Sequence, residues 1–96
     1  GLGIPAEPLF RSLRFPPNEP TYFAEWASLD LRVKRYAEGI SAAKHCIEIA
    51  PEYADGYLLL GLLQMENKQK EEARKNLEKA KELGDTRAEG YLKKLK

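Results

Sequence analysis

A five-residue phrase occurs twice in the chain: ADGYL at residues 54–58 returns as AEGYL at residues 88–92, a spacing of 34 residues. Self-similarity at a fixed period of about 20–50 residues is the signature of a solenoid, in which one supersecondary unit stacks on a copy of itself. This repeat constrains the fold more than any single motif does, because successive units must present matching surfaces. A single domain of 96 residues has room for two such units and a short extra element.

Apolar residues recur at helical spacing from residue 20 onward, which indicates an all-α fold. We expect helices over residues 20–32, 36–50, 52–66, 70–83 and 86–95. Pro20 suits the first position of a helix, where its missing N–H costs nothing. The third helix is apolar around nearly its whole circumference, so we expect it to be packed on more than one side.

Six positions of the second unit have a characteristic alternation of large and small residues. They are Tyr57, Leu60, Gly61, Ala73, Leu77 and Ala80, and one period earlier they are Phe23, Trp26, Ala27, Gly39, Ala43 and Cys46, followed by Pro51. In these positions and in its period, the chain resembles the tetratricopeptide-repeat (TPR) family. The resemblance implies a TPR-like α-solenoid over residues 20–96, with repeats at 20–53 and 54–87 and a C-terminal capping helix at 86–95.

Small residues predict where the helices approach closely. Gly61 in mid-helix costs about 1 kcal/mol relative to Ala, so its presence indicates a close contact, which we expect with Ala73 and Ala80. In the first repeat we expect a looser contact between Ala27 and Gly39. Trp26 is bulkier than the residue usual in its position, which suggests that this repeat packs against something large.

Residues 1–19 differ from the rest because they hold most of the prolines, which favour extended backbone. Within this Pro-rich arm, residues 9–15 (LFRSLRF) are too apolar for a freely solvated linker. We expect the arm to dock on its own repeats or on a partner.

Charge and composition exclude several classes of partner. Sixteen Lys and Arg balance fifteen Asp and Glu, and neither half of the chain is basic enough to favour nucleic acid. No apolar run approaches the roughly 20 residues of a membrane span. A single cysteine fits a reducing compartment, so we expect a cytoplasmic protein, although a leader or anchor could precede the sequence.

Catalytic and metal-binding patterns are missing from the sequence. His45 and Cys46 are adjacent, so on a helix they point about 100° apart and cannot share a metal ion. We expect Cys46 to be a buried apolar residue and His45 to lie on the outer face. The carboxylates alternate with lysines on outer helix faces, so we expect no enzyme, no cofactor and no metal.

The resemblance also implies a concave groove lined by the first helix of each repeat. Projecting the helical period places these residues in it: Thr21, Ala24, Ser28, Leu31, Arg32, Asp55, Leu58, Leu62, Met65, Glu66, Glu89 and Leu92. Some family members hold acidic chaperone tails with Lys, Arg and Asn side chains. The corresponding positions here are Ala24, Ser28, Leu59, Glu89 and Leu92, so we expect no such carboxylate clamp.

An apolar trough of Leu58, Leu62 and Met65 then suggests a non-catalytic protein-interaction module that binds an apolar peptide or helix. Leu92 adds apolar contact, and Arg32 and Asp55 set the register. Four alternatives stay open. The trough is core covered by the arm, or the arm covers the trough until a competitor displaces it. The arm or an end helix packs into a neighbouring subunit to form a homodimer, or the chain is an accessory domain of a larger enzyme or secretion component.

Overall fold

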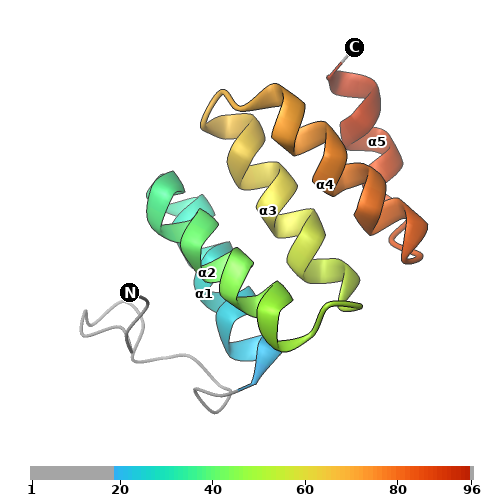
Figure 1. Ribbon diagram of the computed structural model, residues 1–96. Helices are drawn as coiled ribbons and strands as arrows, with labels where there is room; N and C mark the ends of the chain where they lie inside the picture. Colours follow the sequence, from blue (N-terminus) through green and yellow to red (C-terminus); the bar gives the residue numbers. More distant parts are fainter. Residues whose placement is uncertain (1–18, 96) are drawn as a thin grey trace.

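The computed structural model describes residues 19–95, which form α1 (Pro20–Arg32), α2 (Tyr36–Ile49), α3 (Ala54–Glu66), α4 (Lys70–Glu82) and α5 (Arg87–Lys94) (Figure 1). These residues contain no strand, and the expected all-α class is confirmed. The expected Pro-rich arm lies outside the described residues, apart from Glu19. No helix among residues 19–95 is long and apolar enough to cross a membrane.

The helices form two antiparallel hairpins and a final short helix. Helix α1 packs against α2, and α3 packs against α4. Figure 1 shows α3 lying between α2 and α4, with α5 against the far side of α4. Helix α1 also contacts α3, so the first helices of the two hairpins share one face of the stack.

The turns inside the two hairpins repeat with the period of the sequence. Lys34 and Lys68 both adopt positive φ, 65° and 63°. In each turn the next amide donates to a carbonyl in the last turn of the preceding helix, at 2.8 Å and 2.7 Å. This is the Schellman arrangement, which satisfies carbonyls that a helix end leaves without partners. The repeat therefore extends to the backbone geometry of the turns.

The helix ends differ from the expected ends by up to two residues. Helix α2 ends at Ile49 and α3 begins at Ala54, because residues 50–53 form a turn in which the Tyr53 amide donates to the Ala50 carbonyl at 3.0 Å. Pro51 disfavours helical backbone in the residue before it. A short break therefore separates the hairpins.

Two apolar clusters form the core, and α3 contributes to both. Leu59, Leu60 and Leu63 pack with α1 and α2 in the first cluster, whereas Leu58 packs with α4 and α5 in the second. The expectation that this helix is packed on more than one side is confirmed. Because α3 belongs to both clusters, it joins the two hairpins into one body.

Glycines allow the closest helix contacts. A Cβ on Gly61 would lie 2.7 Å from Leu77 Cγ, so the expected close contact with α4 is present. The expected looseness in the first repeat is wrong: a Cβ on Gly39 would lie 2.7 Å from Leu63 Cδ2 and 2.9 Å from Asp30 Cβ. Leu63 belongs to the following hairpin. The expectation compared only residues within the first repeat, so it did not include the contact between Leu63 and Gly39.

Aromatic rings fill the first hairpin. Trp26 stacks on Phe23 with a centroid distance of 6.0 Å, and Tyr22 meets both rings edge-on. His45 was expected on the outer face but is half-buried, with its ring 4.3 Å from that of Phe23. Cys46 is fully buried as expected, and its Sγ donates to the Pro20 carbonyl at 3.3 Å.

Candidate functional site

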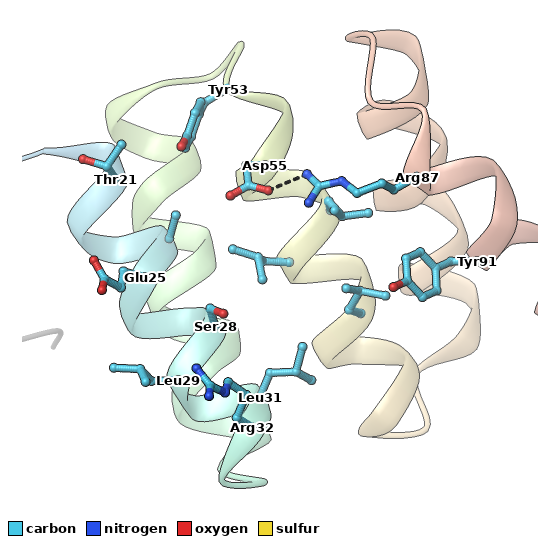
Figure 2. Close-up of a pocket in the computed structure, with 14 residues that line it drawn as sticks. Thr21, Glu25, Ser28, Leu29, Leu31, Arg32, Tyr53, Asp55, Arg87 and Tyr91 are labelled. Atoms are coloured by element: carbon cyan, nitrogen blue, oxygen red, sulfur yellow. Dashed lines mark hydrogen bonds and ion pairs between the residues drawn. The ribbon is translucent and has the colours of Figure 1, made fainter. Parts of the chain in front are cut away.

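A groove of about 550 Å³ lies between α1 and α3 and is flanked by the start of α5 (Figure 2). Its lining comprises Thr21, Ala24, Glu25, Ser28, Leu29, Leu31, Arg32, Tyr53, Asp55, Leu58, Leu59, Leu62, Arg87 and Tyr91. The α1 residues recur at three- and four-residue spacing because such positions share one helix face. The groove is therefore built from the first helix of each hairpin.

The floor of the groove is apolar and the rim is polar. Ala24, Leu58 and Leu59 are only 5%, 2% and 8% exposed. Leu62 is half-buried and lines the groove, so it keeps more accessible surface than Ala24, Leu58 or Leu59. Around this floor stand hydroxyl groups such as that of Ser28 and the exposed guanidinium of Arg32.

Arg87 connects the start of α5 to α3. Its Nη2 donates to Asp55 Oδ1 at 2.8 Å and to Asp85 Oδ2 at 2.7 Å, and its Nε donates to Asp85 Oδ1 at 3.0 Å. Figure 2 shows the Arg87 side chain reaching across the groove wall to Asp55. The paired hydrogen bonds to Asp85 are the strong, two-point geometry that a guanidinium makes with a carboxylate.

These contacts change the ionisation of both partners. The side-chain hydrogen bond from Arg87 lowers the pKa of Asp85, and the same bond, followed by that to Asp55, raises the pKa of Arg87. Asp85 therefore stays a carboxylate and Arg87 a cation at neutral pH. Asp85 Oδ1 also accepts from the Arg87 amide at 3.0 Å, which ties the loop before α5 to the first residue of the helix.

Tyr53 adds a phenol to the groove just before α3. Burial, and then the negative charge of Asp55, raise the pKa of Tyr53. The hydroxyl group therefore remains protonated at neutral pH and can donate or accept a hydrogen bond. It stands near the end of the groove where Thr21 begins the α1 lining (Figure 2).

Comparison with known families decides the class of the second hairpin. Residues 54–83, which span the whole of α3 and α4, match the model of the family described as Tetratricopeptide repeat. The chain carries a tetratricopeptide repeat. TPR domains generally mediate protein–protein interaction and are typically non-catalytic. No curated protein matches the chain.

The groove contains most of the residues that the sequence pattern placed there. Thr21, Ala24, Ser28, Leu31, Arg32, Asp55, Leu58 and Leu62 all line it. Met65 and Leu92 are not part of the lining, and both are half-buried against the second core cluster. Glu66 and Glu89 are exposed and also stand outside the lining.

Other lining residues were not anticipated from the sequence: Glu25, Leu29, Tyr53, Arg87 and Tyr91. Leu59 also lines the groove, and the sequence had named it only as a position of the chaperone-tail clamp. Arg87 and Tyr91 are four residues apart and therefore share a face of α5, which is a signal that the sequence contains. The sequence projection instead chose Glu89 and Leu92, which lie on other faces of that helix. Among residues 19–95, no group of three or more His, Cys, Asp or Glu side chains could hold a metal ion.

Proposed function

We propose that the domain binds a polypeptide segment in the groove between α1 and α3, as an extended peptide or one face of a helix. The observation that supports this most directly is the apolar floor inside a hydrogen-bonding rim. Such a floor can bury the apolar side chains of a ligand, at about 25 cal/mol per Å² of apolar surface removed from water. Polar groups on the rim can then orient the ligand.

The residues have different expected roles. Leu58, Leu62 and Ala24 supply apolar contact, and Ser28 and Leu31 line the α1 side. Arg32 is exposed at the end of α1 and can pair with a carboxylate of the ligand. Asp55 already accepts a hydrogen bond from Arg87, so it acts through that pair rather than as a free acceptor.

Peptide display with the intact chain tests the proposal. Peptides selected on the natural sequence are measured against Leu62→Glu, which places a charge on the groove floor. The matched control is Ile49→Glu, which makes the same kind of change at a 39% exposed position outside the lining. We expect Leu62→Glu to abolish binding and Ile49→Glu to retain it, with circular dichroism confirming that both variants fold.

Selected peptides that bind Leu62→Glu as tightly as the natural chain would place the binding surface elsewhere. Light scattering of the same samples addresses the homodimer expected from the sequence. A dimer that Leu62→Glu dissociates would identify the groove ligand as a second copy of the chain instead of a separate protein.

A further inference from the structure

The two ends of the groove carry opposite charges. Asp55 stands at one end, near the start of α3, and Arg32 stands at the other, as the last residue of α1 (Figure 2). The α1 lining from Thr21 to Arg32 spans about 16 Å, since a helix rises about 1.5 Å per residue. Leu58 and Leu62 follow Asp55 at intervals of three and four residues and share its face of α3. The apolar floor therefore lies between an acidic end and a basic end.

Asp55 belongs to a group of three charges in which one negative charge is in excess. Arg87 Nη2 donates to Asp55 Oδ1 at 2.8 Å and to Asp85 Oδ2 at 2.7 Å, so one guanidinium faces two carboxylates. The Asp85 side chain is only 6% exposed, whereas that of Asp55 is 35% exposed and lines the groove. The excess negative charge of the group therefore reaches the groove at Asp55.

Arg32 supplies a positive charge that has no partner in the described part of the chain. The residue is exposed, and no hydrogen bond or ion pair within residues 19–95 engages its side chain. A basic side chain at the end of a helix can cap the last carbonyls. Here the carbonyls of residues 29–31 already accept the amides of residues 33–35. The guanidinium of Arg32 is therefore available to a ligand.

We propose that the groove ligand is a polypeptide segment with an apolar side chain on Leu62, an acidic side chain at Arg32 and a basic side chain at Asp55. Because the ligand occupies the same groove, this inference rests on the proposed function. An extended segment advances about 3.3 Å per residue, so its two charged side chains would stand about five positions apart. In a helical segment they would stand about eleven positions apart, or three turns.

Opposite charges at the two ends also determine the direction of the ligand. A segment that lies the other way round brings like charges together at both ends, which is repulsive. A uniformly acidic segment is repelled at Asp55, and a uniformly basic one is repelled at Arg32. Glu25 lines the groove between the two ends and already has an interaction partner, so no ligand contact is assigned to it. The groove therefore favours a segment of mixed charge.

Peptides selected on the intact chain from a random-sequence phage library are the probe. We expect them to share an acidic and a basic residue on opposite sides of an apolar residue. The tightest peptide is then measured against Arg32→Glu and against Lys44→Glu, which makes the same change of net charge at an exposed position of α2 outside the lining. We expect Arg32→Glu to weaken binding about fivefold to tenfold and Lys44→Glu to change it by less than about twofold.

Exchange of charges tests each contact separately. Replacing the acidic residue of the peptide by Lys should weaken its binding to the natural chain and restore its binding to Arg32→Glu, because the two charges are opposite again. At the other end, Asp55→Asn keeps an acceptor for Arg87 and removes one negative charge. It should weaken the selected peptide about twofold to fivefold. A peptide whose basic residue is replaced by Gln should not distinguish Asp55→Asn from the natural chain.

Leu62→Glu separates this inference from the proposed function. If Leu62→Glu abolishes binding while Arg32→Glu acts no more strongly than Lys44→Glu, the groove binds peptides and the charge assignment is refuted. Retained binding by Leu62→Glu would refute the groove itself as the site. Selected peptides without the pair of charges, or a charge exchange that fails to restore binding to Arg32→Glu, would also overturn the assignment. A dimer whose formation blocks peptide binding would assign the groove to a second copy of the chain instead.

Discussion

At the scale of single residues, two helical glycines, Gly61 and Gly90, have opposite surroundings in the structure. A Cβ on Gly61 would meet Leu77 Cγ at 2.7 Å and the Ala73 carbonyl oxygen at 3.3 Å, and the backbone atom cannot rotate away. A Cβ on Gly90 would meet nothing within 4 Å. Substitution of Gly by Ala should therefore lower the free energy of unfolding at position 61 and raise it at position 90.

We expect Gly61→Ala to lower the free energy of unfolding by about 1–3 kcal/mol, because the added methyl group overpacks the contact between α3 and α4. Gly90→Ala should raise it by about 0.5–1 kcal/mol, because Ala has the higher helix propensity. Urea denaturation of both variants measures the two values. A stabilising Gly61→Ala would contradict the close approach of these helices.

At the scale of elements, α5 is held at its start by Arg87 and at its end by Arg74, whose Nη2 donates to the Leu95 carbonyl at 3.2 Å. Asp85, the main partner of Arg87, has a lowered pKa in the folded state. Its contribution to stability is therefore complete above the pKa of the unfolded chain, about 3.9. It is lost as the pH falls through the lower folded value.

We expect Arg87→Gln to destabilise α5 at pH 7 and to differ less from the natural chain at pH 3, which lies below the unfolded-state pKa of Asp85, so that part of the contribution of this contact is lost there. Lys93→Gln is the matched control, since it removes one charge from the exposed side of the same helix. Amide hydrogen exchange in α5 at the two pH values measures the effect. If the difference in amide hydrogen exchange between Arg87→Gln and the natural chain is equally large at both pH values, the Arg87–Asp85 contact is not its cause.

At the scale of the whole molecule, two core clusters share α3, so the hairpins should unfold together. Cys46 lies fully buried in the first cluster, and burial, followed by the charge of Asp55, raises the pKa of its thiol to about 11. In the folded chain it should react very slowly with thiol reagents at pH 8. Its labelling rate therefore reports on opening of the first hairpin.

Leu77→Ala creates a cavity in the second cluster and should cost about 2–5 kcal/mol. We expect Leu77→Ala to accelerate labelling of Cys46 by the factor that corresponds to the fall in the free energy of unfolding. The reason is that α3 packs in both clusters, so that weaker packing in the second cluster also destabilises the first hairpin. The test compares the rate of thiol labelling under native conditions with the stability that urea denaturation gives for the same variant. Unchanged labelling in a destabilised Leu77→Ala protein would mean that the second hairpin opens by itself.

Much of the architecture followed from local pattern. The predicted first helix, residues 20–32, coincides with α1, and the other ends differ only slightly, because apolar spacing, glycines and prolines act over a few residues. The α1 side of the groove was placed for the same reason. The α5 contribution was not, since the face that α5 turns toward α3 depends on contacts of Arg87 with residues distant in sequence.

The 34-residue period and the sizes of the repeated residues determined by themselves that this chain forms stacked helical hairpins with a close contact at Gly61. Only the tertiary structure decided that Met65 and Leu92 pack into the second core, that Gly39 is held tightly by Leu63, and that Arg87 joins Asp55 at the groove. Helix periodicity defines which residues share a face. The rotation of each helix against its neighbours depends on long-range packing and on pairing of buried and partly buried charges, which local pattern does not encode.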